Sequence, residues 1–144
     1  MECYFVNFVQ PYFLISRTYS SMAFTINPKS AGNLHYIHIE FTGQLTLQLR
    51  KEAFEISKTY IHTNGIKRAV WDISKANAGS GILNTHEIVT ELLSLKLPSD
   101  LKIVLLGSAQ QSITQYAETV AFNRGYTNIK AFTDSEEALR WLAL

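Results

Sequence analysis

IKRAVWDIS, at residues 66–74, is the segment that decides the predicted fold. It is short, apolar at most positions and rich in β-branched and aromatic residues, which is typical of a strand buried on both faces. Turn-forming residues precede it, and small residues follow it. We therefore expect residues 66–74 to be an inner strand of a parallel sheet. Because ligands and partners of such sheets meet the loops at the carboxyl ends of the strands, the following loop, residues 75–81, is the first place to look for function.

The chain before this strand contains a predicted hairpin and a predicted helix. Residues 22–26 and 34–41 have strand patterns, and residues 27–33 between them favour a turn, so an antiparallel pair is expected. Thr46 is a suitable N-cap for a helix that ends at Asn64-Gly65. The inward stripe of this helix is predicted to be Leu49, Ala53, Ile56 and Tyr60, with the charged residues Arg50, Lys51, Glu52, Glu55 and Lys58 largely outside.

Helices and strands continue to alternate after residue 74. A helix is expected at residues 83–95 and a buried strand at 101–106, and residues 108–111 have the spacing of a capping box that opens the next helix. Gly125 is the predicted C-cap of that helix, and a short strand follows at residues 128–132. A second capping box at residues 133–136 begins a terminal helix with Ala138, Leu139, Trp141 and Leu142 facing inward. The predicted fold class is single-domain α/β, with the order β-β-α-β-α-β-α-β-α and a mixed, mostly parallel sheet.

Size and composition exclude several classes of protein. The chain has 144 residues, which fits one domain, and its 13 basic and 12 acidic residues give a net charge of +1. No field of one sign is present to attract nucleic acid or an anionic membrane, so nucleic acid is not an expected partner. The single cysteine, Cys3, cannot form an intramolecular disulfide, which favours a cytoplasmic location.

The first 21 residues differ from the rest and are expected to be an N-terminal extension. Their aromatic run is too short and too interrupted for a transmembrane helix, and it lacks the preceding basic residues of a secretory signal. Met22 opens a segment that resembles the natural start of a domain. The predicted division is therefore an extension at 1–21, able to add an edge strand or cover an apolar face, and a domain at 22–144.

Three segments carry a resemblance to a known family. They are IHIEFTG at residues 37–43, VWDI at 70–73 and FTDSEEALRWL at 132–142. Together they resemble the SpoIIAA-like family of the STAS superfamily over about residues 22–144. The resemblance implies a small β-sheet with helices packed around it. Relatives use this fold as phosphorylation-switched antagonists of anti-sigma factors or as modules similar to CRAL-TRIO lipid carriers.

The loop after the inner strand departs from that family. The sporulation antagonists carry an Asp-Ser-Ser-Gly motif there, with the phosphorylated serine at the start of a helix. This chain has Ala78-Gly79-Ser80-Gly81 instead, without the preceding acid. The resemblance makes Ser80 the nearest counterpart of the phosphorylated serine, whereas the alternative is that Gly79, Ser80 and Gly81 only form a flexible turn.

No set of catalytic residues is indicated. His35 and His38 are an odd number of residues apart on one predicted strand, so they project from opposite faces and cannot share a metal. His62 lies near a helix end, and only His86, beside the Ser80 loop, is well placed for a function. Asp72 is expected to orient the loop by accepting backbone N–H bonds. The two tryptophans are expected to pack in or against the core, and neither a cofactor nor a metal is predicted.

Two classes of function remain. The first is a non-enzymatic regulatory or protein-interaction module that uses the Gly79-Ser80-Gly81 loop and the helix at 83–95. The second is a carrier of a small apolar or lipid-like ligand held under a helix. An enzyme ranks third, and the sequence leaves the oligomeric state open, including a homo-oligomer.

Overall fold

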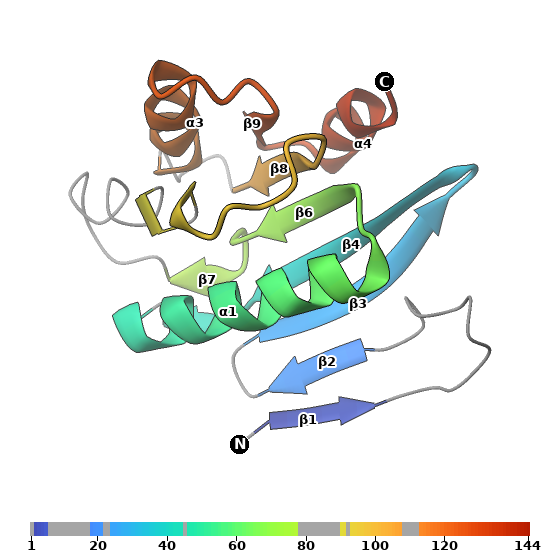
Figure 1. Cartoon of the computed structure of the whole chain (residues 1–144), viewed down its shortest axis with the longest axis vertical. Helices are drawn as coiled ribbons and strands as arrows, with labels where there is room; N and C mark the ends of the chain where they lie inside the picture. The colour runs from blue at the N-terminus through green and yellow to red at the C-terminus, as the bar shows by residue number, and fades with distance from the viewer. Residues whose placement is uncertain are drawn as a thin grey trace.

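A computed structural model describes residues 2–5, 18–21, 24–44, 46–77, 90–91, 93–107 and 113–144 of the chain. Its main sheet has the strand order β1-β2-β3-β4-β6-β8-β9 (Figure 1). These strands are β1 (Glu2–Phe5), β2 (Thr18–Ser21), β3 (Phe24–Ala31), β4 (Leu34–Phe41), β6 (Arg68–Asp72), β8 (Lys102–Leu106) and β9 (Ile129–Phe132). The helices described with both ends are α1 (Leu47–Asn64), α3 (Ile113–Asn123) and α4 (Ser135–Ala143).

The sheet is mixed in the way the sequence predicted. β4, β6, β8 and β9 run parallel, and β3 pairs with β4 antiparallel. The inner strand is confirmed, because β6 lies between β4 and β8, although it is shorter than residues 66–74. From β3 onward the described elements follow the predicted order, with helical residues at 90–91 and 93–94 between β6 and β8. The fold is therefore the single-domain α/β fold expected.

The hairpin is longer than predicted. Residues 27–31, which were predicted as part of a turn, continue β3, and the turn lies at Gly32-Asn33, where Gly32 has φ +63°. Pro28 is paired with Ile37 of β4 and lies beyond the part of β3 that β2 pairs, at an edge position of the kind where proline is tolerated. The prediction gave Asn27 and Pro28 too much weight as turn formers, whereas pairing with β4 decides the conformation.

Alternate residues of the strands face two different layers. On the first face, α1 and α3 cover a core around Ile26, Ile39, Trp71 and Ile103. Trp71 is 6% exposed, and its ring lies 5.0 Å from that of Phe54 and 6.0 Å from that of Phe41, measured between centroids. Its predicted packing role is confirmed.

On the second face, α4 packs Ala138 and Leu142 against Val70, Val104 and Leu106. Two basic side chains hold the last turn of α4. Arg68 donates to the carbonyl of Leu142 and Lys102 to that of Trp141, both at 2.7 Å. These bonds satisfy carbonyls that the end of a helix leaves free. α4 thereby lies over β8 and β9 (Figure 1).

Helix caps confirm one prediction and correct another. The hydroxyl of Thr46 accepts the N–H of Leu49, and Gly65 ends α1 with φ +61°, as expected. The predicted capping box at residues 133–136 is wrong in its cap: Asp134, not Thr133, accepts the N–H groups of Glu136 and Glu137. The carboxylate has two acceptor oxygens and a negative charge suited to the helix N-terminus, so it is the better cap.

One predicted surface residue is buried. Arg50 was expected on the outer face of α1, but it is only 5% exposed. The aliphatic stem of arginine can cover apolar surface, and a helical pattern based on charge alone does not register this.

A second sheet of two strands contains the first part of the loop after β6. β7 (Ala76–Asn77) pairs in parallel with β5 (Gly43–Gln44), so the beginning of the predicted functional loop is tied to the segment after β4. β1 and β2 place part of the extension at the edge of the main sheet, as the sequence allowed. The rest of the predicted helix at 83–95 and the capping box at 108–111 lie outside the described residues.

Within the described ranges, no helix is both long and apolar enough to cross a bilayer.

Candidate functional site

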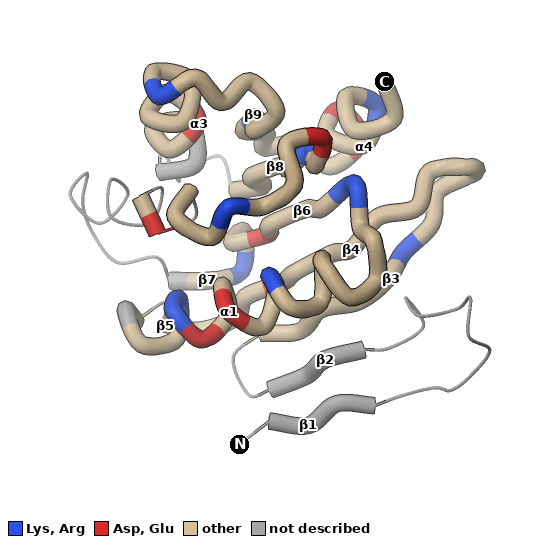
Figure 2. The backbone as a smooth tube through the Cα atoms, in the orientation of Figure 1, with Lys and Arg blue, Asp and Glu red and all other residues tan. Residues whose placement is uncertain are grey.

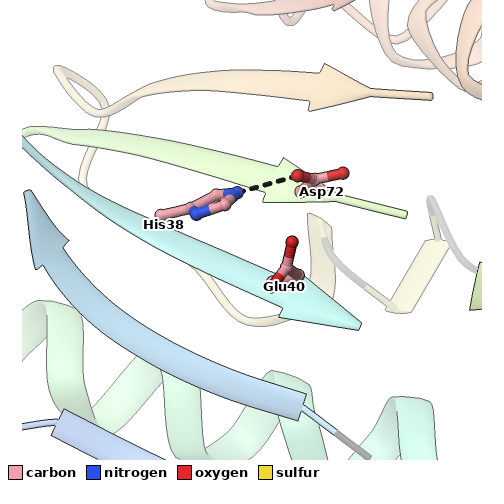
Figure 3. A group of neighbouring side chains, drawn as sticks. All are labelled: His38, Glu40 and Asp72. Carbon is pink, nitrogen blue, oxygen red and sulfur yellow. Dashed lines mark hydrogen bonds and ion pairs between the residues drawn. The ribbon is translucent and has the colours of Figure 1, made fainter. Parts of the chain in front are cut away.

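A polar cluster lies on the second face of the sheet, at the carboxyl ends of β4 and β6. Glu40 on β4 is the register partner of Asp72 on β6, and His38 precedes Glu40 by two residues. Because alternate residues of a strand share a face, all three side chains point to the same side (Figure 3). Two neighbouring parallel strands thus bring together a histidine and two carboxylates, although His38 and Asp72 are 34 residues apart in sequence.

Hydrogen bonds hold Asp72 from three sides. The Nε2–H of His38 donates to Oδ2 at 2.8 Å, while the N–H and the hydroxyl of Ser74 donate to Oδ1 at 2.9 and 2.6 Å. Asp72 is only 5% exposed. Burial opposes its ionisation, but the hydrogen bonds from His38 and Ser74 and the charge of His38 outweigh burial, so the pKa of Asp72 lies below its usual value. The carboxylate is therefore ionised at neutral pH.

The start of the loop is also held by an ion pair. Lys75 lies 3.2 Å from the carboxylate of Glu40, measured from Nζ to Oε2. The lysine side chain is 67% exposed, so this ion pair contributes little to stability. The bonds from Ser74 to Asp72 and this ion pair place the first residues of the loop beside the cluster.

A groove of about 600 Å³ runs from this cluster to α4. Val70, Leu106 and Ala138 form an apolar floor, and Lys29, Tyr36 and Thr133 are among the polar residues around it. The full lining consists of Asn27, Lys29, Tyr36, His38, Glu40, Val70, Asp72, Ser74, Lys75, Leu106, Gly107, Thr133, Ser135, Ala138 and Leu139. The volume is in the range of ligand-binding clefts, but most of the lining side chains are polar.

The chemistry of the cluster differs from that of a hydrolase triad. In a triad, histidine accepts the proton of the serine hydroxyl and aspartate orients the histidine. Here the hydroxyl of Ser74 donates to Asp72 and not to His38. Ser74 is therefore not activated as a nucleophile by His38. The ligand atoms of His38, Glu40 and Asp72 all lie within 4.8 Å of one another, an arrangement that could hold a cation.

The predicted site residues are only partly within the described ranges. Asp72 accepts the backbone N–H of Ser74, two residues further along the chain. Gly79, Ser80, Gly81 and His86 lie outside the described residues. His35 and His38 do face opposite ways: His35 is exposed and bonds to the hydroxyl of Ser30 at 3.0 Å.

Sequence analysis missed the partnership of His38 with Asp72 and Glu40. The sequence pattern that could have indicated this cluster is His38 and Glu40, two residues apart on one predicted strand, together with Asp72 at the end of the next predicted strand. That signal becomes informative only with the pairing register of β4 and β6. The prediction compared His38 only with other histidines, so no metal ligand set was recognised.

Charges are mixed over the described part of the molecule. Figure 2 shows basic and acidic positions interspersed along α1 and around the strands, without a segment of one sign. This agrees with the net charge of +1.

The architecture and the site together define an α/β protein whose polar groove lies at the carboxyl ends of parallel strands. Its fold is SpoIIAA-like, as the sequence indicated. The solved structure of an uncharacterised protein of the DUF3478 family from Shewanella loihica PV-4, which has a SpoIIAA-like fold, matches with a TM-score of 0.57 at 22% identity, over 85% of this chain and 97% of the other.

Two structures of SpoIIAA are also similar. The unphosphorylated anti-sigma factor antagonist matches with a TM-score of 0.45 and 14% identity, over 83% of this chain and 97% of the other. The phosphorylated Bacillus cell fate determinant matches with a TM-score of 0.43 and 16% identity, over 81% and 98%. No family model and no curated protein matches the sequence. At sequence identities this low, the similarity is evidence for the fold alone.

Proposed function

We propose that the protein is a non-enzymatic binding module that receives a segment of a regulatory protein partner in the groove beside α4. The observation that carries this proposal is the groove itself, which joins an apolar floor to a rim of polar side chains. Protein-binding surfaces combine an apolar centre with a polar rim in the same way. The loop after β6 forms one wall through Ser74 and Lys75, so the loop predicted to be functional borders this surface.

The hydrogen-bonded cluster favours recognition over catalysis. Both oxygens of Asp72 are engaged, and Ser74 serves as a donor to the carboxylate. A buried network with satisfied hydrogen bonds is rigid, which presents a fixed surface to a partner at low entropic cost.

A carrier of an apolar or lipid-like ligand is less well supported. Such a ligand needs an enclosed apolar cavity, whereas this groove is open and polar around its rim. Another cavity, lined by Leu93, Leu97, Ile103 and Ile129 among others, is more apolar but holds only about 250 Å³. That is below the roughly 300–1,000 Å³ of typical ligand pockets.

The test compares two charge reversals in a partner capture experiment. Lys29→Glu changes the rim of the groove, and the matched control Lys51→Glu makes the same change on exposed α1, which packs on the first face. The immobilised full-length protein is used to capture proteins from a lysate of its own organism. We expect a partner that is retained by the wild type and Lys51→Glu but lost with Lys29→Glu. Retention by both variants, or the absence of a specific partner, would contradict the proposal.

Phosphorylation of Ser80 is a second, separable part of the proposal. A phosphate adds about −1.5 to −2 charges, and at the start of the helix predicted for residues 83–95 it would meet free N–H groups and the positive end of the dipole. We expect Ser80→Asp to release the partner and Ser80→Ala to retain it, with both thermal midpoints close to that of the wild type. Unfolding by Ser80→Asp would show a structural cap, and equal capture by both variants would leave Ser80 as an ordinary turn residue.

A further inference from the structure

The cluster at the end of the groove contains one imidazole and two carboxylates, which are metal-ligating groups. We propose that His38, Glu40 and Asp72 form a binding site for a divalent first-row transition-metal cation, for which Zn²⁺ is the probe. This inference depends on the geometry of three side chains and not on whether a protein partner enters the groove.

The three side chains are close enough to share one cation. Each offers one ligand atom, and these atoms all lie within 4.8 Å of one another. Zinc bonds to nitrogen and oxygen measure about 2.0–2.2 Å, so tetrahedral ligand atoms lie roughly 3.4 Å apart. Figure 3 shows the imidazole of His38 and the two carboxylates directed into the same space. Small side-chain rotations on the two central strands would complete the set.

Asp72 is already oriented as a ligand. Ser74 occupies Oδ1 with two hydrogen bonds, which leaves Oδ2 directed toward His38. Carboxylates that bind metals are commonly held by hydrogen bonds of this kind, which fix their orientation. Ser74 would therefore be a positioning residue for the site.

A cation would replace two interactions, of which the exposed ion pair of Lys75 with Glu40 is the weaker. The exposed Lys75 would leave Glu40, and the cation would take the place of the hydrogen between His38 Nε2 and Asp72 Oδ2. The Nε2 proton of neutral His38 would move to Nδ1, and that of protonated His38 would pass to solvent. Two carboxylates would then balance the charge of the dication.

The ligand types indicate the kind of metal. One imidazole and two carboxylates suit Zn²⁺ or Mn²⁺, whereas Ca²⁺ and Mg²⁺ prefer ligand sets made entirely of oxygen. Three protein ligands leave a fourth position for an external ligand, as in zinc sites that are not purely structural. The side chain of His38 is 15% exposed and that of Glu40 25%, so this position opens toward the groove.

The experiment measures Zn²⁺ binding to the full chain by titration calorimetry after treatment with a chelator. Glu40→Gln and His38→Gln each remove one ligand, and Glu40→Gln preserves the size of a partly exposed side chain. The controls are His35→Gln, on the opposite face of the same strand, and Cys3→Ser, which removes the only thiol. Thermal midpoints without metal show that each variant is folded.

We expect one Zn²⁺ per wild-type chain, an affinity at least about tenfold weaker in both ligand variants, and no change in either control, because even changes in outer partners cost about 10–100-fold. Added Zn²⁺ should also raise the thermal midpoint of the wild type but not of Glu40→Gln. Unchanged binding by Glu40→Gln, equal loss in His35→Gln or Cys3→Ser, or no saturable binding by the wild type would overturn the inference.

Discussion

At the scale of single residues, Trp71 connects the sheet to α1 within the core on the first face. It lies on β6 in the centre of the sheet and contacts Phe41 on β4 and Phe54 on α1. Its side chain is almost fully buried, so it contributes both apolar burial and aromatic contacts.

Trp71→Ala is therefore expected to lower the free energy of unfolding by about 3–5 kcal/mol, because a large buried ring is replaced by a cavity. Phe122→Ala is the control: this ring is 63% exposed, and a change within about 0.5 kcal/mol is expected. Urea unfolding of both variants measures the difference. Similar losses would show that Trp71 is not central to the core.

Asp72 makes stability depend on pH. Its folded pKa lies below that of the unfolded chain, which is about 3.9. The ionised carboxylate therefore stabilises the fold fully above about pH 5, and this contribution is lost as the pH falls through 4 toward the folded pKa.

Asp72→Asn should remove this dependence and cost about 1–3 kcal/mol at pH 7, since His38 and Ser74 lose an ionised acceptor. Urea unfolding in a chelating buffer, from pH 7 to the lowest pH at which both proteins fold, measures the gap in stability. The gap is expected to shrink below pH 4. A gap that is constant with pH would mean that folding does not stabilise the ionised form of the Asp72 carboxyl group.

At the scale of elements, α4 is fixed at both ends. Asp134 caps its N-terminus, and Arg68 and Lys102 bond to its last carbonyls. Lys102 also lies 4.4 Å from the centre of the Trp141 ring, and burial followed by the charge of Arg68 lowers the pKa of this lysine. The helix that forms one wall of the groove is thus held in a defined position.

Asp134→Ala should lower the free energy of unfolding by about 1 kcal/mol, because two N–H groups of the first turn lose their acceptor. Thr133→Ala is the matched control and should cost less than about 0.5 kcal/mol. Thermal unfolding of the two variants distinguishes the observed cap from the predicted one. The reverse order of effects would favour Thr133 as the cap.

At the scale of the whole molecule, a truncation at Met22 tests whether the extension at 1–21 and the domain at 22–144 are separable. The described pairing of β2 with β3 covers only Tyr19 with Ile26 and Ser20 with Thr25.

A chain that starts at Met22 is therefore expected to unfold in one cooperative step, with a midpoint close to that of the full chain. Far- and near-ultraviolet circular dichroism followed together during heating tests this expectation. A midpoint lowered by many degrees, or two separate transitions, would show that residues 1–21 belong to the folded core.

Local sequence was sufficient for much of the architecture. The apolar pattern of residues 66–74 and 101–106 predicted buried strands, because burial on both faces leaves few polar positions in a strand. Thr46 and Gly65 marked the ends of α1, because caps act within one turn of the helix. The same local rules failed at residues 27–31, where pairing with β4 outweighs the turn preference of Asn27 and Pro28.

The candidate site depended on information that local patterns do not contain. The sequence by itself determined that Asp72 ends a buried strand and that His38 and Glu40 share one face of another. Only the tertiary structure decided that Glu40 lies opposite Asp72, because the register between parallel strands is set by packing across a long crossover. That register places three ligand atoms within 4.8 Å of one another and positions them beside the groove formed with α4.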